Sequence, residues 1–434
     1  MTTVCKTVFA TLLVVALTSP LLGDATPAAP AAAPDASQTI HLRAERLPDQ
    51  ARHDIGAVAS RAVLRAFVEA HPGVDLEPFV MPQVSTSTSF DSGPLMAIAG
   101  GVPPNVMFVN FRRSSTYIAQ GFLEPMEVLI ARVQSANPRV RETGAAGKWL
   151  ADPSQAEIEK SIDAIKSRIP PPMWPVIYRE DETGVIAGRH VWCINTTNLI
   201  VALLYRKDLF YDAGLDPERP PRDWNEFLEY ARRLTIPERN QYGLGLYGPT
   251  MSWATSTFFT SNGARIVEKD SQGKWSAVYG SDDAADALHF IWRLCREPFK
   301  RDGRTIRGTT LIYPDRLDIP WNRGQLGMQL NYLNEELLSN INPQLIGIAP
   351  VPLSPKGTRS SEINGEMLGV FSGSTPAQKL AAAKYIWFVT SDEALRIRTK
   401  TYVDGGYGIV TSPELLRRFG YDRLLAQVPK EWSD

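Results

Sequence analysis

The chain has 434 residues, of which 44% are apolar, so it can bury a large core and form two or three domains. This composition excludes an intrinsically disordered chain. The formal net charge is -1, and no dense run of lysine and arginine with interleaved aromatics occurs, so nothing in the sequence predicts a nucleic-acid partner.

The N-terminus has the three-part pattern of a secretory signal peptide. Lys6 precedes the mostly apolar run Val8–Gly23, and small residues follow it. Pro20 and the shortness of the run argue against a membrane span, which needs about 20 apolar residues. We expect residues 1–25 to be a signal peptide that is cleaved near Ala25. An uncleaved N-terminal anchor is the alternative.

The cysteines and the segment after the signal add to this expectation. Cys5 lies before the apolar run, so a lipid anchor is not expected, and residues 26–37 are an Ala/Pro-rich linker. Cys193 and Cys295 remain, and such a pair permits one disulfide without showing it. Cys295 falls on the apolar face of a predicted helix, which favours a buried thiol.

Predicted strands and helices alternate along the first half of the chain. Apolar residues recur at helical spacing from Ala59 to Ala70, and the continuous apolar run Asn198–Tyr205 is typical of a strand covered on both faces. Further strands are predicted at Gln38–Glu45, Val74–Met81 and Val106–Phe111, and a hairpin at Val176–Thr197. This alternation predicts an α/β layered fold.

The middle and end of the chain contain three amphipathic helix patterns. Gly214 can end a short helix over Lys207–Ala213, and Asp223 can cap the next one. We expect the tryptophans on the three apolar stripes to lie in the core. The stripes are Trp224, Phe227, Leu228, Ala231 and Leu234; Ala284, Leu288, Ile291, Trp292 and Cys295; and Leu380, Ala383, Ile386, Trp387 and Val389.

The sequence lacks the motifs of common catalytic and cofactor sites. The five histidines are scattered without metal-ligand spacing, and no phosphate-binding loop, dinucleotide glycine fingerprint or nucleophile elbow is present. The adjacent carboxylates Asp181–Glu182 and Glu335–Glu336 are typical of a solvated face. We therefore expect no cofactor, no metal and no enzyme activity.

Five stretches of the chain carry a resemblance to a known family. One is LLYRKDLFYDAGLDPERPPRDWNEFLEYARRLT, residues 203–235, and the others are Gly100–Met126, Met251–Val267, Trp321–Tyr332 and Ile363–Ala394. In the same order, these stretches resemble the family 1 extracellular solute-binding proteins of ABC importers, the sugar-binding group that includes maltose-binding protein. The segment between Ala131 and Arg189 is longer than in a minimal member of that family.

The resemblance implies an α/β, two-lobe periplasmic binding protein fold of type II, with an interlobe cleft and hinge crossings. Lobe 1 would comprise residues 38–197 and 331–365, and lobe 2 residues 198–330 and 366–434. The strand at Leu199–Tyr205 would carry the chain from one lobe to the other. The block that follows it would be scaffold at a hinge and would permit closure.

The resemblance also implies a ligand site in the cleft. Sugar C–H faces stack on aromatic rings, and hydroxyls bond to polar side chains. Asn110, Arg112 and Arg113 would lie in a loop after a strand, and Glu366 and Met367 at the last crossing. The complete expected set is Asn110, Arg112, Arg113, Trp253, Asn331, Tyr332, Asn334, Glu366, Met367 and Tyr407.

The implied function is a soluble periplasmic or extracellular monomer that captures a carbohydrate and delivers it to the permease of an ABC transporter. An oligosaccharide, polyol, glycerol phosphate or peptide remains open as ligand, and Arg112 with Arg113 leaves room for a uronate. Two other classes remain open: an exported glycoside-active enzyme, which would turn its ligand over, and a ligand-binding sensor subunit.

Overall fold

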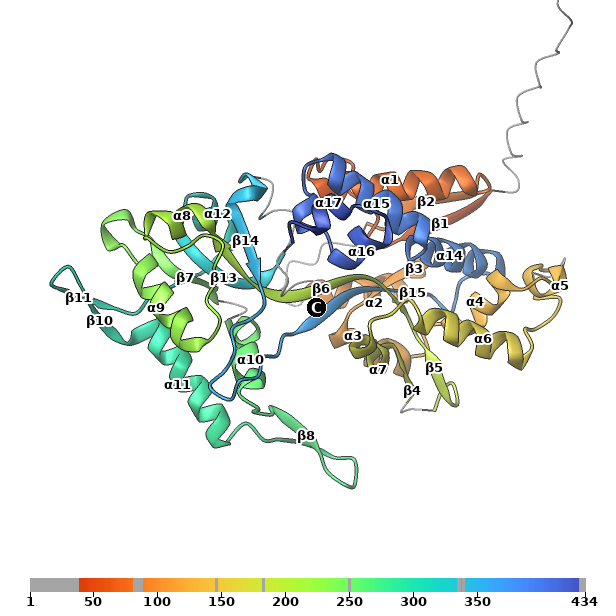
Figure 1. Cartoon of the computed structure of the whole chain (residues 1–434). Coiled ribbons are helices and arrows are strands. Elements are labelled where there is room, and N and C mark those ends of the chain that lie inside the picture. The colour runs from red at the N-terminus through yellow and green to blue at the C-terminus, as the bar shows by residue number, and fades with distance from the viewer. Residues whose placement is uncertain are drawn as a thin grey trace, which may run out of the picture. The chain divides into compact units, whose positions relative to one another are not determined.

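The computed structural model describes residues 39–80, 89–144, 147–181, 184–248, 251–333, 337 and 340–428 (Figure 1). Residues Thr39–Asp434 form one compact unit. The expected signal peptide and linker lie outside the described residues. Within the described ranges, no helix is long and apolar enough to cross a membrane.

Nine strands of the described chain form one sheet, in the order β12-β7-β13-β6-β15-β3-β1-β2, with β14 also paired with β6. Neighbours within β12-β7-β13 and within β3-β1-β2 are parallel, whereas β6 and β15 pair antiparallel to their neighbours. The strands are β1 (Ile40–Ala44), β2 (Val74–Pro78), β3 (Val106–Val109), β6 (Ile194–Arg206), β7 (Tyr242–Tyr247), β12 (Thr310–Tyr313), β13 (Leu326–Tyr332), β14 (Ile346–Ala349) and β15 (Ile363–Val370). The predicted α/β class is confirmed.

Strands β6 and β15 join the two parallel groups. β6 has 13 residues, and its later part pairs with β13 while its earlier part pairs with β15. β15 in turn pairs with β3 through its second half. Figure 1 shows the two strands running side by side from one group to the other. The hairpin predicted at Val176–Thr197 is confirmed where Tyr178–Glu180 pairs antiparallel with Arg189–Val191. Its predicted last residues, from Ile194 onward, instead belong to the continuous strand β6.

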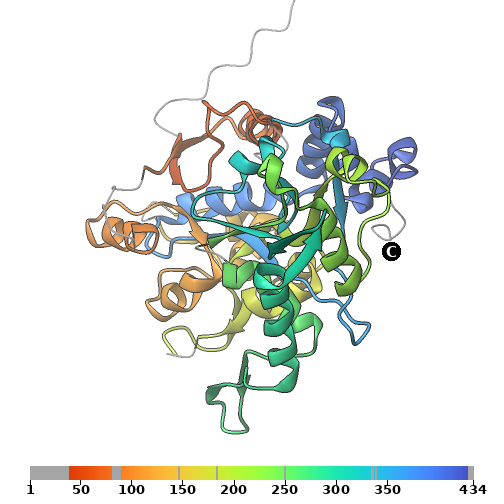
Figure 2. The ribbon, with the colours of Figure 1, turned by 90° about the vertical axis from the view of Figure 1, so that its left-hand side faces the viewer.

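Helices lie on both sides of this sheet (Figures 1 and 2). They are α1 (Ile55–Ala70), α2 (Ser89–Ala99), α3 (Phe111–Ala119), α4 (Met126–Gln134), α5 (Pro138–Arg141), α6 (Gln155–Lys166), α7 (Trp174–Ile177), α8 (Lys207–Asp212), α9 (Trp224–Leu234), α10 (Met251–Ser261), α11 (Asp282–Arg296), α12 (Asp318–Asn322), α14 (Pro376–Val389), α15 (Asp392–Asp404), α16 (Pro413–Arg418) and α17 (Asp422–Leu425). The predicted cap of α9 is confirmed, because the Asp223 carboxylate accepts the N–H groups of Asn225 and Glu226.

Three short antiparallel hairpins project from this framework. They are β4 (Tyr178–Glu180) with β5 (Arg189–Val191), β8 (Val267–Lys269) with β9 (Trp275–Ala277), and β10 (Pro298–Arg301) with β11 (Arg304–Arg307). The β8–β9 hairpin extends away from the sheet in both ribbon views. Its Trp275 side chain is exposed.

The apolar side chains gather in three clusters. Cluster 1 lies around β1, β3 and α14, and cluster 2 around α9, α10 and α11. Cluster 3 contains Leu317, Trp321, Leu326 and Tyr407. Because successive strand side chains point to opposite faces, β6 contributes Val201 and Leu203 to cluster 2 but Ala202 and Leu204 to cluster 3. Clusters 2 and 3 therefore cover opposite faces of β6.

The clusters divide the C-terminal segments differently from the predicted lobes. Met367 and the helix α14 belong to cluster 1 with the first strands, although residues 366–434 were expected in lobe 2. Ala349 and Val351 belong to cluster 2, although residues 331–365 were expected in lobe 1. The reason is that β15, and not the segment before it, carries the chain back to β3.

The prediction for the α11 stripe is confirmed for Ala284, Ile291 and Cys295, which are buried or pack against cluster 2, but it is wrong for Leu288 and Trp292, which are exposed. The helix buries Ala284, Ala287, Phe290 and Leu294, a face rotated from the expected one. Trp292 is 48% exposed and its ring stacks on His289 with centroids 5.7 Å apart. Trp224 is buried as predicted, whereas Trp387 is half-buried with the Arg168 guanidinium 3.4 Å above its ring.

Both cysteines of the described chain are free thiols. Cys193 is buried in cluster 1, and burial raises the pKa of its thiol to about 12. Cys295 is half-buried beside cluster 2, and burial raises the pKa of its thiol too. The expectation of a thiol on the apolar side of α11 agrees with this placement.

Gly243 lets β7 approach α9. A Cβ atom at this position would lie 2.1 Å from the Ala231 carbonyl oxygen. We expect Gly243→Ala to lower the free energy of unfolding by about 1–3 kcal/mol, because helix and strand must move apart. Urea unfolding measures this, and Gly73→Ala is the control, because its Cβ would meet nothing within 4 Å. Equal effects of the two substitutions would contradict the close approach.

Candidate ligand-binding site

Polar residues follow the carboxyl ends of two parallel strands. β1 and β3 lie side by side and parallel; Glu45 and Arg46 follow the first and Asn110 follows the second. The crevice beyond the carboxyl ends of parallel strands is where open α/β sheets bind ligands. The ends of β1 and β3 therefore form one wall of a candidate site.

Arg46 is held in this wall by two side-chain contacts. Its backbone is left-handed, with φ of 62°, a conformation that costs free energy for a residue with a side chain. Its guanidinium carbon lies 4.0 Å from the centroid of the Phe108 ring, and its Nε lies 3.5 Å from a Glu366 oxygen. The buried Glu45 carboxylate accepts the Phe108 N–H at 2.7 Å and so fixes this strand end.

Strand β15 and the residue directly before it contribute a row of polar side chains. Glu362, Asn364 and Glu366 alternate along the chain and therefore point to one face of the sheet. All three are half-buried. Met367 points to the opposite face and is fully buried in cluster 1, so the expectation that it contacts ligand is wrong.

An aromatic pair lies beside the start of this row. The Trp253 and Tyr332 rings meet edge to face with centroids 4.6 Å apart, and both pack against cluster 2. The Tyr332 hydroxyl donates a hydrogen bond to the Glu362 carboxylate. Burial, followed by this carboxylate, raises the pKa of Tyr332 well above its ordinary range, so the hydroxyl stays protonated.

These residues share one face of the sheet. Tyr332 pairs with Val201 of β6, and the Val201 N–H donates to the Glu362 carbonyl, so β13 and β15 flank β6 at the same level. We call this face, lined by Arg46, Phe108, Trp253, Tyr332, Glu362, Asn364 and Glu366, with Asn110 following the end of β3, the front-face site. It combines aromatic rings with hydrogen-bonding groups, an arrangement suited to a hydroxylated ligand.

The structure does not bring the whole predicted set together. Asn331 pairs with Ala202, so its side chain points to the opposite face, where its amide donates to Gln329 Oε1 at 3.2 Å. Tyr407 packs against cluster 3, also on that face. The cause in both cases is the two-residue period of a strand, which separates sequence neighbours.

Three other predicted residues cannot be placed by their side chains. Arg112 and Arg113 lie in the first turn of α3 and not in the expected loop, and their side chains lie outside what the structure describes. Asn334 lies outside the described residues.

Sequence reasoning missed four residues of the front-face site. Alternation of polar residues from Glu362 to Glu366 was a signal for two of them, Glu362 and Asn364. No sequence pattern marks Arg46, whose place depends on its left-handed backbone. Phe108 lies within the apolar run of β3, and such a run predicts a buried side chain and not a ligand contact.

Relatives identified by sequence match parts of the chain. A binding protein of Brucella abortus is 26% identical over 164 residues, which are 37% of each chain. The sn-glycerol-3-phosphate-binding periplasmic protein of Agrobacterium fabrum is 24% identical over 222 residues, 48% of this chain and 46% of that protein. This chain therefore aligns with less than half the length of these curated relatives.

Solved structures show the same fold. A solute-binding protein of Thermotoga lettingae bound to α-D-tagatose matches 91% of this chain with a TM-score of 0.61 at 17% identity, and 86% of that protein is covered. The solved structures that this chain resembles are binding proteins of type II, as expected. The family model of the bacterial extracellular solute-binding proteins matches residues 52–395. From this match over most of its length, the chain belongs to the bacterial extracellular solute-binding proteins.

Proposed function

We propose that this protein binds a neutral sugar or polyol at the front-face site and delivers it to the permease of an ABC transporter. The observation that carries the proposal is the Trp253–Tyr332 pair next to the polar row of β15. The rings offer apolar surface to C–H groups, and Glu362, Asn364 and Glu366 accept hydrogen bonds from hydroxyls. The tagatose-bound relative and the glycerol-phosphate-binding relative support a hydroxylated ligand.

The charges of the site favour a neutral ligand. Two carboxylates, Glu362 and Glu366, line it, and the Arg46 guanidinium is engaged with Glu366. An anionic ligand would meet these carboxylates in a half-buried site, where like charges repel strongly. Hydroxyl groups can instead donate hydrogen bonds to these carboxylates. A ligand that leaves one buried polar group without a hydrogen bond loses about 1–3 kcal/mol of binding free energy, so the site can select among ligands.

We propose that this chain binds its ligand without chemical turnover, which is supported by its membership of a non-enzymatic family. We propose that bending at β6 and β15 closes the site. Ligand then shifts the protein towards the closed arrangement only because it binds that arrangement more tightly than the open one. We also propose that the protein is exported after cleavage near Ala25 and acts as a monomer. N-terminal sequencing and light scattering test these two points.

Isothermal titration calorimetry tests the ligand class. The panel contains D-tagatose, maltose, D-mannitol, sn-glycerol 3-phosphate and D-glucuronate. We expect saturable heat with at least one neutral compound and none with the two anions, and the ligand should be recovered unchanged. Binding of only an anion would overturn the neutral class, and consumption of the ligand would favour the exported enzyme.

Two substitutions test the site itself. We expect Trp253→Ala to weaken binding of the neutral ligand about 10-fold or more. The substitution removes the contact between the ring and the ligand, and a loss of about 1.4 kcal/mol of binding free energy lowers the affinity 10-fold. Glu366→Gln should weaken it less, because the amide still accepts one hydrogen bond. Trp275→Ala on the exposed β9 is the matched control and should leave the affinity unchanged. Unchanged affinity in Trp253→Ala would place the ligand elsewhere.

A further inference from the structure

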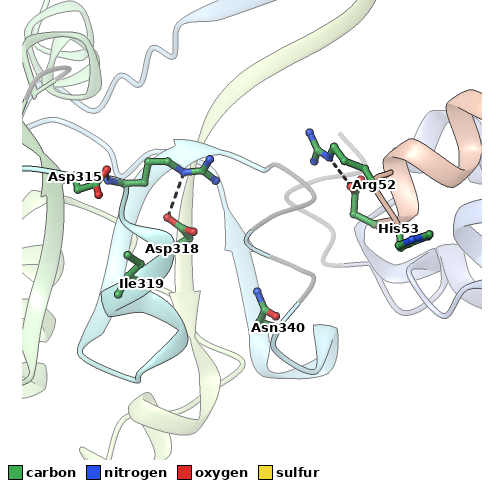
Figure 3. Close-up of a pocket in the computed structure, with 8 residues that line it drawn as sticks. Arg52, His53, Asp315, Asp318, Ile319 and Asn340 are labelled. Carbon is green, nitrogen blue, oxygen red and sulfur yellow. Dashed lines mark hydrogen bonds and ion pairs between the residues drawn. The ribbon is translucent and has the colours of Figure 1, made fainter. Parts of the chain in front are cut away.

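Two groups of polar side chains lie outside the front-face site. One lines a cavity of about 510 Å³ between the segment before α1 and the segment around α12 (Figure 3). In one wall Arg52 pairs with Asp54 at 2.8 Å. In the other wall Arg316 pairs with Asp318 at 3.4 Å, so each wall balances its own charge. The other group lies in β6 and contacts the backbone of Glu366, a residue of the front-face site.

Strand β6 contains a β-bulge at the level of Glu366. Glu366 pairs with Thr197, but Met367, the next residue of β15, pairs with Asn195. Thr196 is therefore the extra residue of the bulge. A bulge bends its strand and changes the direction of neighbouring side chains, and bulges occur often beside functional sites. This one lies where β15 presents Glu366 to the front-face site.

Two consecutive side chains of β6 hold the Glu366 carbonyl group. The Thr196 hydroxyl donates a hydrogen bond to this carbonyl oxygen at 3.0 Å. In the orientation that satisfies its surroundings, the Asn195 amide nitrogen donates to the same oxygen at 3.2 Å and to the Thr197 carbonyl oxygen at 3.0 Å. Asn195 is 5% exposed, and burial strengthens such bonds. The two bonds fix the peptide plane after Glu366 and with it the direction of the Glu366 side chain.

The Asn195 amide reaches this carbonyl from the face opposite to the front-face site. Asn195 pairs with Met367, so the two side chains share that opposite face. Gly365 leaves room for the amide there, because a Cβ atom at Gly365 would lie 2.0 Å from the Asn195 side chain. Asn195 therefore does not line the front-face site, and any effect it has on ligand has to pass through Glu366.

The Glu366 carboxylate is the group that this arrangement directs. One of its oxygens lies 3.5 Å from Arg46 Nε, and the carboxylate is half-buried in the front-face site. We propose that Asn195 and Thr196 are positioning residues of the ligand site, which hold the Glu366 carbonyl so that the carboxylate points towards Arg46 and a ligand hydroxyl. A hydrogen-bonding group of a binding site has to be held within about 0.5 Å of its working position.

Crystal structures of the ligand-free protein test the positioning directly. The proposal rests on the proposed ligand binding at the front-face site, but the place of the Glu366 carboxylate can be measured without ligand. Thr196→Val keeps the shape of the side chain and removes its hydroxyl, and Asn195→Ala removes the other donor. We expect each to lengthen the separation between Arg46 Nε and the Glu366 carboxylate by about 0.5–1 Å relative to the parent.

Calorimetry with the panel compound that binds tests whether the two residues act through Glu366. Thr196→Val should weaken binding about 2- to 10-fold, and Thr196→Ser, which keeps the hydroxyl, should restore the parent affinity. In a Glu366→Ala background, Thr196→Val should cause no further loss, because the side chain that it misplaces is absent. In a Trp253→Ala background it should cause its full loss, because the ring lies at the other end of the polar row.

The matched control is Thr401→Val in α15, which removes a half-buried hydroxyl that donates to the Ile397 carbonyl at 2.8 Å. It should change neither the separation nor the affinity. An unchanged separation in both Thr196→Val and Asn195→Ala would overturn the positioning role, as would equal affinity losses with and without the Glu366 side chain. A longer separation in a protein that binds no panel compound would reject the proposed ligand class and keep the positioning role.

Discussion

Replacing Glu127 by alanine should lower the free energy of unfolding by about 3–5 kcal/mol, because it breaks a buried ion pair. Glu127 is 2% exposed. One of its carboxylate oxygens bonds His190 Nδ1 at 2.6 Å, and the other accepts the Val191 N–H at 2.9 Å. The substitution leaves both donors without this acceptor, and the cost of unpaired buried groups adds to the lost attraction.

Urea unfolding followed by tryptophan fluorescence measures this change. The matched control is Glu142→Ala, which removes an exposed carboxylate and should stay within about 0.5 kcal/mol of the parent. A loss below about 1 kcal/mol in Glu127→Ala would mean that water reaches and satisfies the donors.

The same pair predicts how stability depends on pH. The bond to Glu127 raises the pKa of His190 above its ordinary value of 6.5. The stabilisation is therefore fully present below about pH 6.5 and is lost as the pH rises through the raised pKa of the folded protein. Unfolding curves between pH 6 and 9 should show a falling free energy, and His190→Gln should flatten that fall. A parent whose stability rises over this range would contradict the assignment.

Phe258→Ala should cost about 3–5 kcal/mol of stability through the cavity it creates. Phe258 is fully buried in α10, and its ring centroid lies 5.2 Å from that of Phe290 and 5.6 Å from that of Trp224. Because α10 also carries Trp253, we expect the affinity for the neutral ligand to fall as well.

Urea unfolding and calorimetry on the same preparation measure both effects. Tyr279→Ala, which removes a 63% exposed ring, is the control and should change neither quantity. A stability loss in Phe258→Ala with unchanged ligand affinity would show that α10 keeps its position without the aromatic cluster. A loss under about 1 kcal/mol would show that the neighbouring rings fill the space.

The sequence predicted the helices and strands of this fold better than it predicted which lobe each of them belongs to. The spacing of apolar residues and the residues that cap helices are local features of a sequence. For this reason the Asp223 cap and the apolar strand at Asn198–Tyr205 could be predicted. The prediction for Leu288 and Trp292 of α11 is wrong because two overlapping apolar faces compete in that helix, and the face with Phe290 packs into the core. The return of β15 to β3 is a long-range pairing, which no local pattern encodes.

The site was predicted in part for the same reason. The family resemblance marks Trp253, Tyr332, Asn110 and Glu366. Of these, Trp253, Tyr332 and Glu366 lie on one face, and Asn110 follows the end of β3. Asn331 and Tyr407 lie on the other face, because facing depends on strand register and on which cluster a side chain enters. Whether the residues on the shared face contact ligand stays a prediction that the calorimetry decides.

The position of β15 in the sheet also governs when the protein can fold. β3 emerges early in synthesis, but its antiparallel neighbour on that side, β15, follows roughly 250 residues later in the chain. Until then the first three strands present an unpaired edge, and unpaired edges slow folding and invite association with other chains. The strand group β3-β1-β2 therefore gains its neighbour β15 only after most of the chain has been synthesised. Until that point the β3 edge of this group stays without its partner strand.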